Sequence, residues 1–146
     1  MTESRIAPDP GEELRQLLER AGRMGEEGDW EGAATELREA LPEWPEDPTL
    51  LCWLGVAERE LGLDGIAYER FRQAVRLEPD DPVLLAVAGT ALAAFDDPDA
   101  EAALRTAALL APGTAEVRWR YGAFLSREGF VDEARSEEHT SELQSL

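Results

Sequence analysis

The sequence has 146 residues, of which 43% are hydrophobic, so it is long and apolar enough to form one globular domain with a buried core. It carries 32 acidic residues against 14 basic ones, all of them arginine. The net charge of −18 disfavours binding to nucleic acids and to anionic membrane surfaces.

The sequence contains no signal for export or membrane insertion. Its apolar runs are too short to cross a bilayer, and the opening residues MTESRIAPDPGEE lack the basic start and apolar core of a signal peptide. Cys52 is the single cysteine, which is consistent with a reducing compartment. We therefore expect a cytoplasmic protein. The absence of lysine and asparagine beside abundant alanine, glycine and arginine resembles the codon bias of a GC-rich bacterial genome.

A period of 33 or 34 residues runs through most of the chain. Alanine recurs at positions 33, 67, 100 and 134, and proline recurs at 45, 79 and 112. A period of this length indicates a repeat architecture, in which each unit buries its apolar face against the next. The same spacing relates two further series, namely the bulky residues Leu37, Phe71 and Leu104 and the glycines Gly55, Gly89 and Gly122.

The predicted elements follow this period in chain order. Residues 1–11 are expected to form a disordered segment, and a helical repeat domain follows at residues 12–135. Its units span about residues 14–47, 48–81, 82–114 and 115–135, the last being partial. Apolar residues recur at spacings of three and four within each unit, which predicts two helices per unit. We expect seven complete helices and an eighth that begins near Val131.

Aspartate, proline and glycine mark the predicted helix ends. The segments Pro-Glu-Asp-Pro and Pro-Asp-Asp-Pro between units predict Asp47 and Asp81 as N-caps, each with proline at the first helical position. Inside the second unit, Gly62 is predicted to end the first helix and Asp64 to cap the second. The third unit is one residue shorter in this turn, where Asp97 is the predicted N-cap.

These positions resemble the tetratricopeptide repeat, whose pattern W-x2-L-G-x2-Y continues with A-x3-F, A and P. The second unit matches best, although Glu58 stands where an aromatic residue is usual. The resemblance implies an all-α fold, an α-solenoid of about three and a half stacked antiparallel hairpins. The matching residues of the second unit are Leu51, Leu54, Gly55, Gly62, Ala67, Phe71, Ala74 and Pro79.

The sequence after residue 135 departs from the repeat. The periodic positions for a bulky residue, an alanine and a proline hold Glu138, Ser141 and Leu146 instead. Residues 136–146 resemble the in-frame translation of a sequencing adapter, so we interpret them as a non-native tail and expect the natural protein to continue differently. The alternative is a polar C-terminal capping helix, which helical repeats commonly need.

No residue pattern indicates catalysis or a cofactor. His139 lies in the interpreted tail, and Cys52 has no second cysteine and no histidine base in the repeat region. The acidic residues Asp96, Asp97 and Asp99 lack the glycine and distal glutamate of a calcium loop, so turn formation is the better interpretation. We expect no catalytic residue, no metal site and no cofactor.

In proteins with this repeat, the first helix of each hairpin lines a groove that binds a peptide or a partner helix. The resemblance therefore implies a protein-interaction scaffold, and it assigns the groove to Leu18, Cys52, Val56, Arg59, Ala86, Thr90, Trp119, Arg120, Ala123 and Arg127. The basic and asparagine positions of chaperone-binding members are occupied by apolar or small residues, so a carboxylate clamp of that type is not expected. Trp53 and Trp119 either line the groove or pack between repeats.

Two alternatives remain open from the sequence. The repeats could be the N-terminal region of a longer, truncated enzyme or sensor, which the genomic sequence past Ala134 would reveal. The chain could also self-associate through its C-terminal end, where an incomplete repeat exposes apolar surface.

Overall fold

The computed structural model describes residues 9–144, and it describes side chains as far as residue 129. This part of the chain contains seven α-helices and no strand, which confirms the predicted all-α fold. None of the described helices is both long and apolar enough to span a membrane. The chain divides into two compact units, residues 1–77 and residues 78–146.

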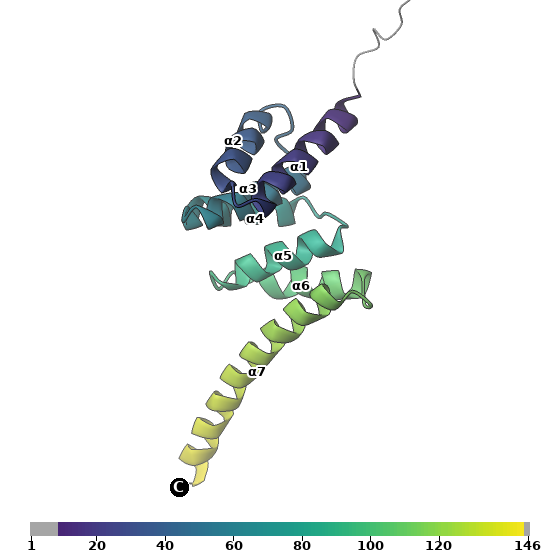
Figure 1. The fold of residues 1–146 in the computed structure, drawn as a ribbon. Helices are drawn as coiled ribbons and strands as arrows, with labels where there is room; N and C mark the ends of the chain where they lie inside the picture. The colour runs from purple at the N-terminus through teal and green to yellow at the C-terminus, as the bar shows by residue number, and fades with distance from the viewer. Residues whose placement is uncertain (1–8, 145–146) are drawn as a thin grey trace, which may run out of the picture. The chain divides into compact units, whose positions relative to one another are not determined.

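The first unit contains two helical hairpins. These are α1 (Pro10–Glu26) with α2 (Trp30–Ala40), and α3 (Pro48–Glu60) with α4 (Asp64–Arg76). Each pair packs as an antiparallel hairpin, and α2 also packs against α3 (Figure 1). The core between the hairpins is built from leucines and alanines at the predicted helical spacing, including Leu17, Ala33, Leu37, Leu50 and Leu54.

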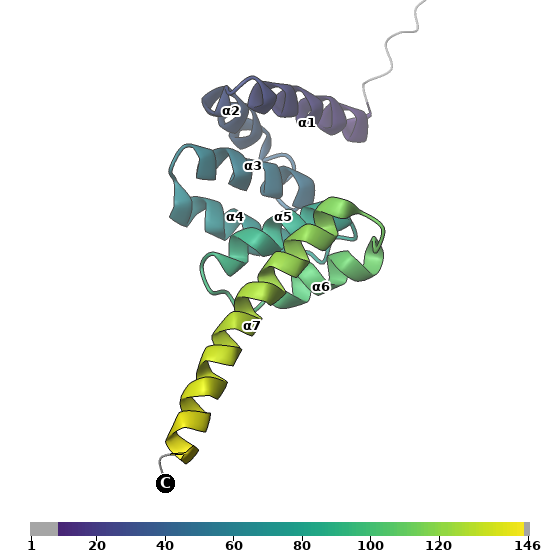
Figure 2. The same ribbon diagram turned by 60° about the horizontal axis from the view of Figure 1, so that its bottom comes forward.

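The second unit contains one hairpin and a long final helix. The hairpin consists of α5 (Pro82–Ala93) and α6 (Ala100–Leu110), and α7 (Ala115–Gln144) packs against both of them. Figure 2 shows α7 crossing this hairpin and then continuing beyond it as a single helix. Val117 of α7 is completely buried, whereas most of the described side chains after it are exposed.

Glycine permits the close approach of the two helices in a hairpin. A Cβ atom at Gly55 would lie 3.0 Å from the Phe71 ring, and one at Gly89 would lie 2.9 Å from Cγ of Leu104. The bulky residue of the second helix therefore fills the space that the glycine leaves on the first helix. This contact explains why the glycine series and the bulky series share one period.

Three of the predicted helix ends are confirmed. The Asp47 carboxylate accepts a hydrogen bond from the Leu50 amide at 2.9 Å, and Asp81 accepts from the amides of Val83 and Leu84. Gly62 follows the end of α3 with a φ of +82°, a left-handed conformation that glycine adopts without a steric penalty.

Two predicted caps are wrong. Asp64 is the first residue of α4 rather than its N-cap, and the N-cap position falls on Leu63. Likewise α6 begins at Ala100, so Asp97 is not its N-cap. Oδ1 of Asp97 accepts a hydrogen bond from the Asp99 amide at 2.8 Å, which holds these residues in a turn before the helix.

The predicted eighth helix is also wrong, because α7 continues without a break through Gly129 and Val131 to Gln144. A reversal at Gly129 would break helical hydrogen bonds, which only packing of a second apolar helix can offset. The following sequence has Glu138 and Ser141 at the positions where the other hairpins have a bulky residue and alanine. Compared with a hairpin that reverses at Gly129, a single continuous helix therefore keeps its backbone hydrogen bonds and gives up no contact of a bulky apolar residue.

The described residues test only part of the predictions for the two ends of the chain. The helix α1 begins at Pro10, so it includes the last two residues of the predicted N-terminal segment, and residues 1–8 lie outside the described residues. The backbone of residues 136–144 is helical, but the predicted packing of Glu138 and Ser141 concerns side chains outside the described part.

Candidate functional site

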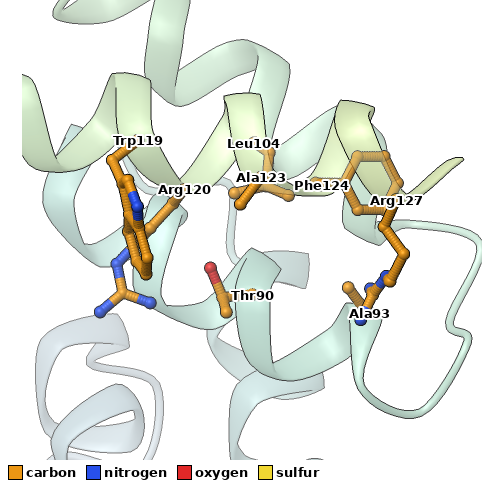
Figure 3. Close-up of a pocket in the computed structure, with 8 residues that line it drawn as sticks. All are labelled: Thr90, Ala93, Leu104, Trp119, Arg120, Ala123, Phe124 and Arg127. Carbon is orange, nitrogen blue, oxygen red and sulfur yellow. The ribbon is translucent and has the colours of Figure 1, made fainter. Parts of the chain in front are cut away.

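A pocket in the second unit brings together half of the predicted groove residues. Its volume is about 280 Å³, and it lies between α5 and α7 with one contribution from α6 (Figure 3). Ala93, Leu104 and Phe124 complete its lining. The predicted residues around it are Thr90, Trp119, Arg120, Ala123 and Arg127.

The two ends of this pocket carry guanidinium groups. Trp119 and Arg120 stand side by side at one end, while Arg127 lies beside Phe124 and Ala93 at the other (Figure 3). Nε of Arg120 donates a hydrogen bond to the Glu116 carboxylate at 3.1 Å. Among the side chains that the structure describes, Arg127 has no hydrogen bond or ion pair, and the two Nη groups of Arg120 make no hydrogen bond. Both arginines can therefore donate hydrogen bonds to an acidic ligand, Arg127 with its whole guanidinium group and Arg120 with its Nη groups.

The floor of the pocket is apolar. The Thr90 hydroxyl donates its proton to the carbonyl oxygen of Ala86 at 2.8 Å, so it offers a ligand only acceptor capacity and a methyl group. Ala93, Ala123 and Leu104 provide the rest of the floor. The indole of Trp119 is 68% exposed and forms an apolar wall at one end. An apolar side chain fits the floor, and carboxylates fit the two ends.

A second, larger pocket lies in the first unit. It has a volume of about 590 Å³ and is lined mainly by apolar atoms of α1, α2 and α3. Trp53 of α3 is 42% exposed and Trp30 packs against Gly25, where a Cβ atom would lie 2.7 Å from the indole. Of the predicted groove residues, only Leu18 lines this pocket.

The rim of the larger pocket carries charged residues that pair with one another. The Arg15 guanidinium hydrogen bonds to the carboxylates of Glu12 and Glu19. The hydrogen bond with Glu12 raises the pKa of Arg15 above its usual value and lowers the pKa of Glu12. Because Arg15 is already paired, the rim offers less charge to a ligand than the ends of the second-unit pocket.

Four predicted groove residues lie outside both pockets. Cys52, Val56 and Ala86 are buried, so their side chains offer no surface to a peptide in this structure. Arg59 is exposed on α3, and its guanidinium lies over the Phe71 ring at 5.5 Å from the ring centre. These four residues therefore line neither of the two pockets.

The structure adds residues that were not predicted for the site. Phe124 lies one helical turn after Arg120, and this spacing of four residues is the signal from which the sequence could have predicted that both line the site. Leu104 belongs to the bulky series, which predicts a core residue, and it is indeed buried beneath the pocket. Trp30 lines the larger pocket without having been predicted, because no spacing relates it to Leu18, whereas Trp53 was predicted either to line the groove or to pack between repeats and also lines this pocket.

The described residues also bear on a metal site. Among them, no three histidine, cysteine, aspartate or glutamate side chains lie close enough together to hold a metal ion. The acidic segment around Asp96 forms the turn before α6, and Asp96 itself has a φ of +56°. Aspartate tolerates this left-handed conformation better than most residues do.

No protein-family model and no curated protein matches the sequence. Its fold does match solved structures. YrrB, described as a tetratricopeptide-repeat protein with an unusual peptide-binding site, matches at 25% identity and a TM-score of 0.64, over 82% of this chain and 62% of that one. The first tetratricopeptide-repeat domain of Spaghetti (RPAP3), bound to the HSP90 peptide SRMEEVD, matches at 18% identity and a TM-score of 0.67. The match covers 85% of this chain and 98% of that one.

A third match is an enzyme of which this chain resembles a small part. The O-GlcNAc transferase of Thermobaculum terrenum matches at 22% identity and a TM-score of 0.69, over 82% of this chain but only 23% of the transferase. At these identities the matches establish the fold rather than the activity. The chain is thus an all-α helical-repeat protein that resembles tetratricopeptide-repeat proteins in structure.

Proposed function

We propose that this chain is a protein-interaction scaffold that binds a peptide or partner helix with mixed acidic and apolar character in the pocket between α5 and α7. The observation that carries the proposal is the arrangement of Arg120 and Arg127 at the two ends of an apolar floor beside exposed Trp119. Tryptophan and arginine are the residues that most often dominate the binding energy of protein interfaces. The chain has no proposed reaction of its own.

The solved structures support peptide binding as the activity. YrrB is described as having a peptide-binding site, and Spaghetti is bound to an HSP90 peptide. The chemistry proposed here differs from a clamp for a C-terminal carboxylate. By the resemblance to chaperone-binding members, the basic and asparagine positions of such a clamp are occupied here by Leu18, Gly22, Cys52, Val56, Ala86 and Thr90. We infer that the acidic groups of the ligand are side chains that reach Arg120 and Arg127.

Selection from a displayed library of random peptides tests this proposal. We expect the enriched peptides to carry acidic residues on both sides of an apolar residue. Substitution of Arg127 by glutamate should weaken binding of a selected peptide by about tenfold or more, because a carboxylate would then face a carboxylate. Trp119→Ala should have an effect of similar size through lost apolar contact.

Arg76→Glu provides the matched control, since Arg76 is an exposed arginine of the first unit. Its substitution changes the net charge by the same amount as Arg127→Glu. It should leave the affinity nearly unchanged. Equal losses for Arg76→Glu and Arg127→Glu would show that binding depends only on overall charge. Enrichment of basic peptides, or of peptides whose affinity is insensitive to Trp119→Ala, would contradict the proposed site.

The rival proposal is that the chain is the repeat region of a longer enzyme or sensor. The match to 23% of an O-GlcNAc transferase favours this possibility, because it shows this fold as part of a larger enzyme. Sequencing the gene through and beyond codon 135 separates the two. Further repeats support the scaffold, and a catalytic domain supports the rival. The result also tests our interpretation of residues 136–146 as non-native, which predicts a different sequence there.

A further inference from the structure

The larger pocket, in the first unit, reaches from the surface to residues of the core. Its volume of about 590 Å³ lies within the range of roughly 300–1,000 Å³ that is typical of small-molecule sites. Leu37 and Ala57, which line the pocket, are each 1% exposed, and Ala33 is 2% exposed. A ligand in this pocket therefore contacts side chains of the core, which favours a compact molecule over a helix that lies across the surface.

Two glycines of α1 and two tryptophans shape this space. Gly22 and Gly25 both line the pocket, about one helical turn apart. The Trp30 indole fills the space beside Gly25, since it lies 2.7 Å from the point where a Cβ atom would stand. No described atom lies within 4 Å of the same point at Gly22, so the space there is open. Trp53, which is 42% exposed, lines the same pocket from α3.

The charges of the pocket favour a cation at one end. Glu26 is the last residue of α1 and lines the pocket, and no side chain that the structure describes makes a hydrogen bond or ion pair with it. The C-terminal end of a helix carries a partial negative charge, which adds to that of the carboxylate. Trp30 begins the next helix, and the face of an indole attracts cations. About three helical turns earlier in α1, Arg15 and Glu19 pair with each other.

The same charges exclude the commonest apolar anions as ligands. A fatty acid or another apolar carboxylate would meet the Glu26 carboxylate at the pocket and the net charge of −18 of the whole chain. A neutral apolar molecule would fit the floor but would gain nothing from Glu26. Charge complementarity therefore selects a ligand that joins a positive charge to an apolar group.

We propose that the pocket lined by α1, α2 and α3 binds a small organic cation, an ammonium group joined to an alkyl or aromatic body. The ammonium group lies beside Glu26 and Trp30 at the end of α1. The apolar body occupies the open space beside Gly22, over Leu37 and against Trp53. This site does not rest on the proposed peptide pocket, because all of its residues belong to the first unit.

Three probes with the same apolar body test the proposal, namely phenylbutylammonium, phenylbutanol and phenylbutanoate. Each is titrated into the full chain at neutral pH, and binding is followed by the indole signals in nuclear magnetic resonance. We expect the ammonium compound to move the signals of Trp30 and Trp53 saturably and to leave that of Trp119 unchanged. At these two tryptophans the carboxylate should bind about tenfold or more weakly than the ammonium compound, with the alcohol between them.

Substitutions in the protein test the two parts of the site separately. Glu26→Gln should weaken binding of phenylbutylammonium by about tenfold and leave that of phenylbutanol unchanged, because it removes only the charge. Glu27→Gln is the matched control, since Glu27 is the next residue, is exposed and does not line the pocket. It should leave both affinities unchanged. Gly22→Leu should weaken binding of both compounds by filling the open space, and circular dichroism should show all three variants folded.

Several results would overturn the proposal. Equal affinity of the three probes would show that charge has no part in binding, and equal losses for Glu26→Gln and Glu27→Gln would show that only overall charge matters. Unchanged signals of Trp30 and Trp53 with phenylbutylammonium would exclude a small cation from the pocket. If a peptide with lysine beside an apolar residue moved these signals instead, the occupant would be a protein partner.

Discussion

Glu58 shows how one residue can depart from a repeat pattern and still fit the fold. Its side chain is completely buried in the first unit, at a position that leucine occupies in α5 and α7. Nε of Arg38 on α2 lies 3.3 Å from its carboxylate, and Nε of Arg70 on α4 lies 3.0 Å from it. Because a buried charge is costly unless it is paired, these two arginines are what make Glu58 tolerable there.

We predict an asymmetry between the two sides of this cluster. The double substitution Arg38→Ala and Arg70→Ala should lower the free energy of unfolding by about 3–5 kcal/mol, because it leaves a buried carboxylate without a partner. Glu58→Leu should change it by only about 1 kcal/mol, because both arginines are partly exposed and can remain hydrated. Urea unfolding followed by circular dichroism measures both. A larger loss for Glu58→Leu than for the double variant would contradict the explanation.

Tyr121 gives a prediction for alkaline pH. Burial raises the pKa of its phenol, and so does its hydrogen bond of 2.9 Å to the Glu101 carboxylate, whose negative charge adds to the effect. A raised pKa in the folded state means that folding favours the neutral phenol. The associated stability is complete below the unfolded pKa of about 10 and is lost as the pH rises through the folded value.

The absorbance of tyrosinate during an alkaline titration measures this shift directly. In a Tyr68→Phe variant Tyr121 is the sole tyrosine, and we expect it to titrate above the ordinary value of about 10. Glu101→Gln should move the midpoint downward, since it removes the negative charge. A midpoint at the ordinary value in both proteins would show that the hydrogen bond is absent in solution.

At the scale of the helices, the sequence predicted which helices form and in what order better than it predicted where each helix begins and ends. The period of 33 or 34 residues indicated the helical hairpins because a small residue of the first helix and a bulky residue of the second recur at that spacing, and glycine meets the bulky residue in the α3–α4 and α5–α6 hairpins. The start of α6 and the continuation of α7 were mispredicted for different reasons. Asp97 has the composition of a cap but forms a turn, and Gly129 resembles a hairpin turn although no apolar helix follows it.

A matched pair of glycine substitutions tests the hairpin contacts. Gly89→Ala should destabilise the protein by about 1–3 kcal/mol, because the new Cβ would meet Leu104 at 2.9 Å and Ala103 at 3.3 Å. Gly122→Ala at the equivalent position of α7 should stabilise it by about 0.5–1 kcal/mol, because the site is open and alanine favours helix. Thermal unfolding compares the two. Similar losses of stability for both variants would mean that another segment covers Gly122 of α7 in solution.

For the molecule as a whole, the repeat register predicted which helix faces carry the candidate site but not which residues are accessible. Five of ten predicted groove residues surround the pocket of the second unit, whereas Cys52, Val56 and Ala86 are buried. The register fixes the direction of a side chain, but burial depends on the size of its neighbours, which a single sequence does not report. The ion pairs of Glu58 were missed for a related reason, since Arg38 and Arg70 belong to other helices.

The most direct test of the scaffold proposal follows the indole protons of the four tryptophans by nuclear magnetic resonance while a selected acidic and apolar peptide is added. Single substitution of each tryptophan by phenylalanine assigns the signals. We predict that the signal of Trp119 moves saturably with peptide concentration, and that it stays fixed in the Arg127→Glu protein. Movement of the Trp53 signal with Trp119 unchanged would place the peptide in the first unit and contradict the proposed site.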